Sequence, residues 1–350
     1  MKERILYADI LRVIAVFLVI VIHISSRDFG LSAVDSVQWQ TLNGYNGLAR
    51  VSVPLFFMLS GMFFLNPDKE VPIKKLYRKN IFRVVLAFLF WSALYAVIFT
   101  LNEYRTLNIE VMKSMYTAFI EGHFHLWFLF RIVEIYVMVP FLRKIAEDKK
   151  TIEYLLLFCF VIGFIIPTYN SFPVSSTTTI MDNPERGLDL DITFGYVGYF
   201  FAGYYLNRFT LSEKVKKTIY AFGVLGVLTT IIETSIRSLQ AGEPYKLLYE
   251  YLTPNVLFAS LAVFLLVKEM CQHRSFSERT QKWILEFSTY SFGIYLIHVL
   301  ILFLLWKWGL NTLVVIPIVS VPLIALVVFF ISYGCIKLMG KIPFLKRFIL

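Results

Sequence analysis

Long apolar segments separated by short polar ones account for most of the chain. Ten of these segments are long and apolar enough to predict membrane-spanning helices. In chain order they cover residues 5–24, 49–65, 81–101, 126–142, 152–167, 192–207, 218–236, 252–270, 288–306 and 313–338. Some contain Gly or Pro, which membrane helices tolerate because their neighbours satisfy the freed backbone groups. The pattern therefore predicts an all-α polytopic membrane protein.

The composition supports the same class. Hydrophobic residues make up 58% of the chain, and the mean hydropathy is +0.67. Soluble domains are about 45–50% apolar on a comparable count. No polar stretch is long enough for a second domain, so we expect residues 1–350 to form a single transmembrane domain with no extra soluble domain. The first segment contains Arg12 and no small-residue cleavage site follows it, so we do not expect a cleavable signal peptide.

The positions of Lys and Arg predict the orientation. With the N-terminus in the cytoplasm, 24 of the 34 Lys and Arg residues fall in cytoplasmic segments and 8 in outer segments. This bias predicts that both termini are cytoplasmic. The acidic outer loop at about 168–191 agrees with it. The net charge of +10 comes from short clusters between apolar segments, which argues against a nucleic-acid partner.

The first predicted span carries three ionisable residues, Asp9, Arg12 and His23. Such groups are costly in lipid unless they face a protein interior or a water-filled cavity. Arg12 and His23 are 11 residues apart, so they share a helix face and lie roughly 16 Å apart along the axis. Asp9 is one turn from Arg12 and can pair with it. We interpret the three as a polar stripe across the membrane, with Arg12 in its cytoplasmic half and His23 near the outer end.

His23 has two interpretations. It is either an amphipathic residue at the level of the lipid headgroups or a general base, since imidazole titrates near neutral pH. As a base it would remove a proton from an acceptor hydroxyl. The polar stripe favours the second interpretation.

The fourth predicted span begins with a histidine- and tryptophan-containing segment. His125 is on the same predicted membrane side as His23, so the two would line one cavity. His123 and His125 do not share a helix face, so we expect no metal site. Trp127 is also typical of an interfacial aromatic belt. Arg131 and Glu134, at i and i+3, form either a neutralised pair that locks two helices or part of a ligand cavity.

Two other spans contain candidate polar residues. Arg50, at the outer edge of the second span, is either a headgroup anchor or a ligand for an anionic acceptor. His298 is predicted near mid-membrane, either as a core histidine bonded to a backbone carbonyl or as a site residue. Tyr295 lies one turn before it and is placed to orient it. Gly61 in the second span permits close helix approach.

A cytoplasmic basic cluster precedes the third span and contains Lys74, Lys75, Arg78, Lys79 and Arg83. Its usual explanation is topology together with contact to anionic lipid. The alternative is that it holds the phosphates of a nucleotide-like donor. The chain has no Walker-type, GxSxG or HExxH motif, and its three cysteines have neither disulfide nor metal spacing.

Together these segments resemble the acyltransferase-3 family of integral membrane acyltransferases. The resemblance covers nearly the whole chain and is greatest to the short stand-alone branch that includes the enterobacterial common antigen O-acetyltransferase. Four elements carry it, in the order expected: Asp9-x2-Arg12-x10-His23, Arg50-x3-Pro54-x-Phe56-Phe57-x2-Ser60-Gly61, His125-Leu126-Trp127-Phe128 and Ser291-x-Gly293-x-Tyr295-x2-His298.

The resemblance implies transfer of an acyl group, usually acetyl, from cytoplasmic acyl-CoA to a sugar hydroxyl outside the membrane. The expected co-substrate is acetyl-CoA or another acyl-CoA, and no metal is expected. The expected acceptor is a cell-surface glycan or its lipid-linked precursor. The expected location is a bacterial plasma membrane, which the chain would cross several times.

The resemblance also suggests residue roles. His23 would act as general base or transient acyl carrier, with Arg12 and Asp9 completing the catalytic group. The residues expected to bind the acceptor or line its cavity are His125, Trp127, Arg50, Arg131, Glu134, Tyr295 and His298. The residues expected to bind acyl-CoA are Arg12, Arg78, Lys79 and Arg83.

Two competing functions fit the span pattern. One is a transporter of a small polar solute or glycan precursor, since a polar stripe across ten spans suits transport as well. No internal repeat supports that function. The other is a non-catalytic membrane partner in glycan assembly, which would not require His23.

Overall fold

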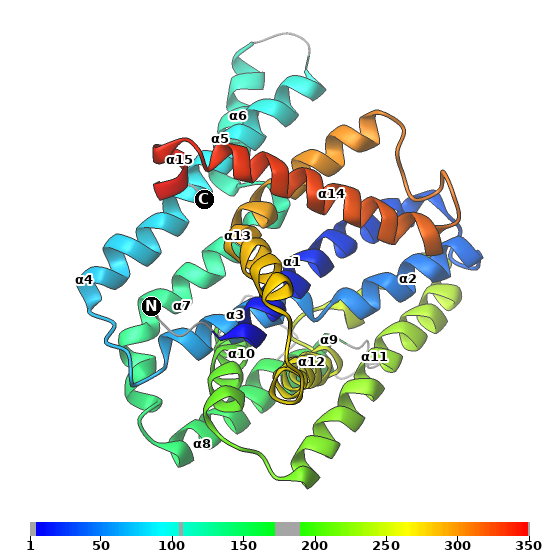
Figure 1. Cartoon of the computed structure of the whole chain (residues 1–350). Coiled ribbons are helices and arrows are strands. Elements are labelled where there is room, and N and C mark those ends of the chain that lie inside the picture. The colour runs from blue at the N-terminus through cyan, green and yellow to red at the C-terminus, as the bar shows by residue number, and fades with distance from the viewer. Residues whose placement is uncertain (1–4, 105–107, 172–189, 349–350) are drawn as a thin grey trace.

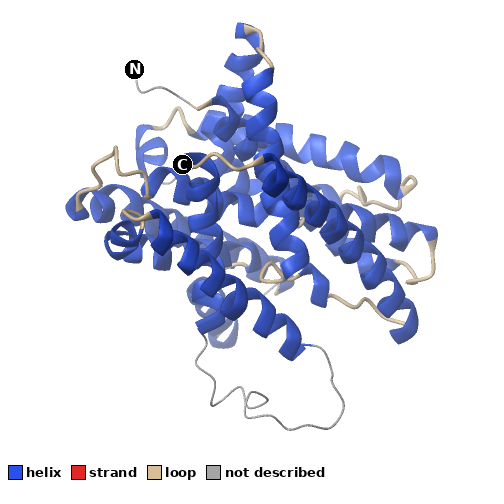
Figure 2. Cartoon of the chain, turned by 90° about the horizontal axis from the view of Figure 1, so that it is seen from below, coloured by secondary structure: helices blue, strands red, loops and turns tan. Residues whose placement is uncertain are grey.

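The computed structural model describes residues 5–104, 108–171 and 190–348, and within them the chain is helical with no strand (Figure 2). The helices are α1 (Leu6–Arg27), α2 (Val37–Ala49), α3 (Ser52–Phe64), α4 (Ile73–Lys75), α5 (Phe82–Glu103), α6 (Ile109–Glu121), α7 (Trp127–Ile145), α8 (Lys149–Phe160), α9 (Ile166–Ser171), α10 (Leu190–Arg208), α11 (Glu213–Ala241), α12 (Pro254–His273), α13 (Glu278–Lys307), α14 (Pro317–Met339) and α15 (Pro343–Phe348). Short segments with other helical geometry are η1 (Asp28–Leu31), η2 (Leu76–Ile81), η3 (Phe124–Leu126), η4 (Val161–Ile165) and η5 (Leu247–Tyr249).

The predicted all-α membrane class is confirmed. Across the described ranges, nine helical segments are long and apolar enough to cross a membrane. They correspond to all the predicted spans except 192–207. That span coincides with α10, a helix of 19 residues, and its crossing of the membrane stays a prediction.

The second predicted span begins earlier than expected. It starts at Val37 with α2, breaks at Arg50 and Val51, and continues as α3. The pattern missed α2 because its sequence is polar. Neighbouring helices satisfy these polar groups: the Asn43 amide, for example, donates to the carbonyl of Ile231 in α11 at 3.0 Å.

The basic cluster before the third span is helical and extends that span toward the N-terminus. The segments α4, η2 and α5 form one helical run from residue 73 to 103. Of its turns, η2 has π geometry, with one extra residue per turn. The chain also contains α6, which was not predicted and packs beside α5 (Figure 1). Most of the acidic loop predicted at 168–191 lies outside the described residues.

The first helix lies at the centre of the bundle. It contacts α2, α3, α12, α13 and α14, and α13 runs beside it (Figure 1). The two helices run in the same direction, because Asp9 meets Ser288, and His23, later in α1, meets His298, later in α13. A helix so enclosed can carry ionisable side chains away from lipid.

Two glycines allow α3 and α10 to cross in direct backbone contact. A Cβ atom on Gly61 would lie 1.7 Å from the carbonyl oxygen of Phe200, and one on Gly203 would lie 2.0 Å from that of Met58. No side chain fits at either position. The expectation that Gly61 permits close helix approach is confirmed.

Candidate active site

The polar stripe of α1 begins with an ion pair. Arg12 donates to Asp9 at 2.8 Å, as its spacing predicted. The carboxylate, of which only 3% is exposed, also accepts a hydrogen bond from the Ser288 hydroxyl of α13 at 2.6 Å. The Arg12 guanidinium lies 4.8 Å from the ring centre of Phe63. Asp9 therefore fixes Arg12 and ties the start of α1 to α13.

A basic cavity of about 250 Å³ opens beside Arg12. Its cationic side chains are Arg12, Lys79 and Arg83. The rest of its lining comes from α3, η2, α5, α7 and α13, and comprises Phe56, Ser60, Asn80, Val84, Phe128, Ile132, Tyr136, Ser291, Phe292 and Tyr295. Cations that converge from two helices make this cavity suitable for an anionic ligand.

Lys79 and Arg83, four residues apart, share one face of the helical run from residue 73 to 103, and that face borders the basic cavity. Lys79 lies in η2 and Arg83 follows in the first turn of α5, and both line the cavity. Arg78, also predicted to bind the donor, is exposed and lies outside the lining. The structure thus brings two of the three predicted basic residues together with Arg12.

An aromatic layer forms the inner end of the basic cavity. It consists of Phe56, Phe128 and Tyr295, whose ring centres are 5.7–6.3 Å apart. On the far side, the Tyr295 ring centre lies 5.8 Å from that of His125 and 6.0 Å from that of His298. The aromatic layer therefore separates the cavity from a group of histidines.

Four histidines gather beyond the aromatic layer. The ring centre of His23 is 5.1 Å from that of His298 and 6.4 Å from that of His125. The ring centres of His125 and His298 are 5.4 Å apart. His123 and His125 form a hydrogen bond between their Nδ1 atoms at 3.0 Å. His23 and His125 share one site, as expected, and His298 lies level with His23 rather than deeper. We call these four residues the histidine cluster.

Backbone carbonyls fix the protonation of two of these rings. A carbonyl only accepts, so His125 donates from Nε2 to Leu296 at 3.3 Å, and His298 donates from Nδ1 to Tyr295 at 2.6 Å. In a neutral ring the other nitrogen then carries a lone pair. For His125 that nitrogen accepts from His123. For His298 it is Nε2, which is buried and has no hydrogen-bond partner among the described residues.

Tyr295 and Tyr95 hold the histidine cluster in place. The Tyr295 hydroxyl donates to the carbonyl of His125, so Tyr295 contacts two histidines and orients His298 through its backbone. The Tyr95 hydroxyl donates to the carbonyl of Leu296 at 2.9 Å and accepts from the amide of Leu300 at 3.1 Å. In a regular helix the Leu300 amide would donate directly to the Leu296 carbonyl, so the Tyr95 hydroxyl bridges the two groups of this backbone pair of α13.

Arg50 is half-buried and held by neighbouring polar and aromatic side chains. Its guanidinium donates to the side-chain oxygen Oδ1 of Asn46, in the same helical run, and lies 4.5 Å from the ring centre of Tyr249. Asn46 donates in turn to the hydroxyls of Ser25 and Ser26, just after His23 in α1. This network fixes Arg50 near the outer end of the polar stripe.

A second cavity, which we call the polar cavity, has a volume of about 340 Å³ and is lined in part by Trp127. Trp127 and Tyr251 stack in its wall with ring centres 5.8 Å apart, and Arg131 and Glu250 supply charge. Its other lining residues are Pro167, Thr168, Ser171, Tyr196, Leu247, Leu252 and Thr253. Tyr251 also faces Arg50, so it links the polar cavity to the network around His23.

The predicted pair of Arg131 and Glu134 forms, with both carboxylate oxygens within 3.0 Å of the guanidinium. Both residues belong to α7, so the pair does not lock two helices together. Arg131 lines the polar cavity, whereas Glu134 is exposed and does not. Over the described ranges, no three or more His, Cys, Asp or Glu side chains are arranged to hold a metal ion.

The sequence alone did not identify several residues of this site. Tyr95, Ser288, Tyr249 and Tyr251 were not singled out. Tyr95 resembles any aromatic residue in an apolar span, and the two other tyrosines follow a loop with no motif.

Comparison with known proteins assigns the family. No curated protein and no solved structure matches the chain. The resemblance to the enterobacterial common antigen O-acetyltransferase therefore stays a prediction. Residues 5–337, nearly the whole chain, match the acyltransferase-3 family, described as an acyltransferase domain. With its apolar helices and central polar stripe, the chain belongs to the acyltransferase-3 family of membrane proteins.

Proposed function

We propose that this membrane acyltransferase moves an acetyl group from cytoplasmic acetyl-CoA to a hydroxyl of an extracytoplasmic glycan. One observation carries the proposal: a basic cavity and the histidine cluster lie at opposite ends of one polar stripe on α1. The Lys and Arg bias of the sequence puts the basic cavity on the cytoplasmic side.

The basic cavity suits the donor. Acyl-CoA carries phosphates on its nucleotide, and charge-assisted hydrogen bonds from Lys79 and Arg83 would hold them at the cytoplasmic edge. Arg12, further inside, would hold a carbonyl of the pantetheine arm. From Arg12 to His23 the helix rises roughly 16 Å, a length that an extended arm of this kind spans.

The acyl arm has to cross the aromatic layer. Phe56, Phe128 and Tyr295 close the cavity on the side of the histidine cluster. In this proposal the arm displaces the layer when it binds, so that the thioester reaches His23. The closed layer would otherwise keep water and solutes from crossing along the stripe, which makes transport the weaker alternative.

His23 would act as the general base. One imidazole nitrogen takes the proton of the acceptor hydroxyl while the oxygen attacks the thioester carbonyl. The carbon–sulfur bond then breaks, an ester forms, and CoA leaves as a thiolate that takes the proton from His23. The unpartnered Nε2 of His298 would accept a hydrogen bond from His23 and so keep its basic nitrogen toward the hydroxyl.

A covalent route uses the same residue. His23 would attack the thioester itself, form an acyl-imidazole and release CoA, and the acceptor hydroxyl would then take the acyl group. Radiolabelled acetyl-CoA mixed with the protein in the absence of acceptor separates the routes. Label that stays on the wild type but not on His23→Ala supports the carrier, and no label on either supports the base.

The test of the function is release of CoA thiol from acetyl-CoA by purified protein, with a crude membrane glycan extract as acceptor. We expect turnover by the wild type and none by His23→Ala at equal expression. The control is Phe124→Ala, which removes an exposed ring beside His23 instead of His23 itself. The ring centres of Phe124 and His23 are 5.2 Å apart. Equal turnover in His23→Ala would remove His23 from the mechanism. A wild type that neither binds nor consumes acetyl-CoA would overturn the proposal.

A further inference from the structure

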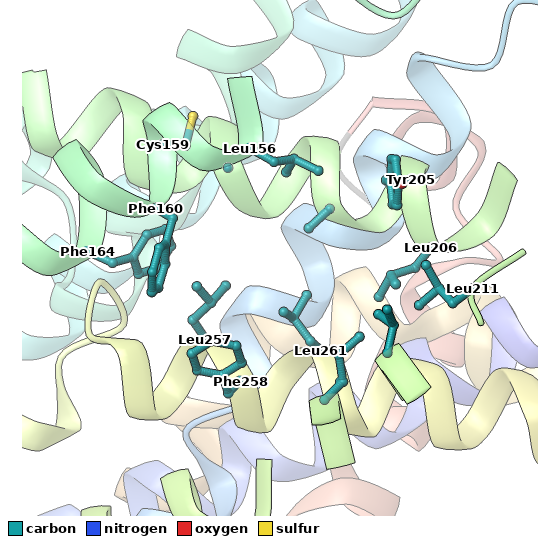
Figure 3. Close-up of a pocket in the computed structure, with 14 residues that line it drawn as sticks. Leu156, Cys159, Phe160, Phe164, Tyr205, Leu206, Leu211, Leu257, Phe258 and Leu261 are labelled. Carbon is teal, nitrogen blue, oxygen red and sulfur yellow. The ribbon is translucent and has the colours of Figure 1, made fainter. Parts of the chain in front are cut away.

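An apolar cavity of about 240 Å³ lies away from the histidine cluster, between α8, η4, α10, α11 and α12. Figure 3 shows the side chains of Leu156 and Phe164 on one side of it and those of Leu257 and Leu261 on the other. The remaining lining residues are Cys159, Phe160, Gly198, Ala202, Tyr205, Leu206, Leu211, Val215, Phe258 and Ile219. No ionised side chain lines this cavity.

The chemistry of this lining suits a hydrocarbon. Its only hydroxyl belongs to Tyr205, which already donates to the Glu153 carboxylate at 2.5 Å. The rings of Phe160 and Phe258 meet from α8 and α12 with centres 5.8 Å apart. A polar ligand would find no partner here and would pay the cost of desolvation, whereas an apolar chain would not.

The apolar cavity continues the polar cavity along the same helices. On α12 the lining changes from Thr253 to Leu257 within one turn, and on η4 and α9 from Thr168 to Phe164 within one turn. On α10, Tyr196 lines the polar cavity and Gly198, on the opposite face of the helix, lines the apolar cavity. The two cavities are therefore stacked along α12 and along η4 and α9, with Trp127 lining the polar one.

Two local features shape the wall of the apolar cavity nearest the polar one. The η4 segment has π geometry, and such turns are frequent at functional sites because they displace side chains from the regular helix positions. Gly198 faces it from α10, where a Cβ atom would lie 3.1 Å from that of Cys159. A larger residue at 198 would push into α8, so the glycine maintains the spacing of the two helices.

We propose that the two stacked cavities bind one glycolipid acceptor, with its sugar in the polar cavity and its hydrocarbon chain in the apolar cavity. This inference rests on the proposed function and narrows the acceptor to a lipid-linked glycan. The sugar stacks on Trp127 and Tyr251, while Arg131 and Glu250 hydrogen-bond its hydroxyls. The hydrocarbon chain of the glycolipid lies along α10 from Gly198 to Leu206, a distance of eight residues or roughly 12 Å.

The placement of these cavities explains how a long acceptor is presented. Tyr251, in the wall of the polar cavity, faces Arg50. Arg50 is hydrogen-bonded to Asn46, which donates to Ser25, two residues after His23. A chain held by the apolar cavity therefore fixes the distance of the anchored sugars from the histidine cluster. A soluble glycan lacks this anchor and binds only through its sugars.

Photolabelling tests the occupant directly. The protein is placed in lipid nanodiscs with a synthetic glycolipid, N-acetylglucosamine joined through phosphate to a short isoprenyl chain that carries a diazirine. We expect label on peptides that contain residues 156–164 and 257–261, and loss of that label when the unlabelled glycolipid is added. A diazirine-bearing phosphatidylglycerol that labels the same peptides and is not displaced would mean bulk bilayer lipid only, and would overturn the inference.

A filled cavity gives the second test. Ala202→Phe places a ring in the apolar cavity, and Ala93→Phe adds the same ring at an exposed position of α5 as the matched control. We expect Ala202→Phe to remove the competed label and to raise KM for the glycolipid at least tenfold, with KM for acetyl-CoA unchanged. Ala93→Phe changes neither. Equal KM values in both variants, with the label retained, would contradict the inference.

The outcomes also separate this inference from the proposed function. A wild type that releases no CoA with any acceptor defeats the function, while competed labelling still supports the glycolipid site. Turnover that depends on His23 without competed labelling defeats the site and leaves the function intact.

Discussion

His298 donates a hydrogen bond from Nδ1 to the carbonyl oxygen of Tyr295 at 2.6 Å, one turn earlier in α13. The bond fixes both the ring and its tautomer, because a carbonyl oxygen only accepts. The other ring nitrogen, Nε2, then carries a lone pair; it is buried and has no hydrogen-bond partner in the described part of the chain. The ring centres of His298 and His23 are 5.1 Å apart. A buried acceptor without a partner carries a cost in stability, which is typical of functional sites.

The first prediction separates the two nitrogens of His298. In His298→Asn the amide NH2 replaces Nδ1 and still donates to Tyr295, whereas nothing replaces Nε2. We expect this variant to unfold at the wild-type temperature and to lose about 10²-fold or more of its acyl transfer rate. The checks are detergent thermal unfolding and CoA release. Full activity in His298→Asn would show that Nε2 takes no part, and His298→Ala, which loses both nitrogens, measures the structural share.

The second prediction concerns the mouth of the basic cavity. Arg83 lines it and Arg78 does not, although both carry the same charge and lie in one helical run. We expect Arg83→Glu to weaken acetyl-CoA binding about tenfold, equivalent to roughly 1.4 kcal/mol, because it replaces an attraction to the phosphates by a repulsion. Arg78→Glu makes the same charge change outside the lining and is the control. Calorimetric titration with acetyl-CoA measures both, and equal losses would indicate a general electrostatic effect rather than a site.

The third prediction concerns Asp9. Its carboxylate accepts from Arg12 and from Ser288, so Asp9→Ala leaves a guanidinium and a hydroxyl without that partner. We expect the free energy of unfolding to fall by roughly 1–3 kcal/mol. The exposed pair of Lys144 and Glu147 provides the comparison, since Glu147→Ala should change stability by less than about 1 kcal/mol.

A double-mutant cycle with Ser288→Ala then tests the contact between α1 and α13. If Asp9 and Ser288 act through their shared bond, the two single effects will not add. Additive effects would mean that the bond does not contribute to stability.

The fourth prediction concerns the crossing of α3 and α10. In Gly61→Ala the new Cβ atom has no room beside the backbone of Phe200, so the helices must separate. We expect a clear fall in the thermal unfolding midpoint and in the yield of folded protein. Gly334→Ala, in α14, adds the same atom where no other atom lies within 4 Å, and it should leave both quantities unchanged. A stable Gly61→Ala protein would contradict the described packing.

The sequence predicted those parts of the fold and site that depend on one helix at a time. Hydropathy identified the spans, and the spacing within α1 placed Arg12 beside Asp9 and aligned both with His23. A regular helix has a fixed rise and rotation, so residue number alone gives these relations.

Relations between helices were harder to predict. Arg78 and Arg83 look alike in the sequence, and only the arrangement of the helices around the cavity shows which one lines it. The helix α2 was missed because Asn43 and Asn46 look exposed, whereas other helices satisfy their amides. Tyr95 gave no signal because its role depends on groups of α13 about 200 positions away.

The pairing of α1 with α13 has a consequence for the response to membrane thickness. Asp9 accepts a hydrogen bond from Ser288 near the start of α1, and the rings of His23 and His298 pack together further along, so the two helices are in contact at both ends of the polar stripe. A thicker or thinner bilayer changes the tilt of single helices, but a pair joined in this way tilts as one body. The interval between Arg12 and His23 is then a property of the protein alone. The reaction distance stays constant when the lipid composition of the membrane changes.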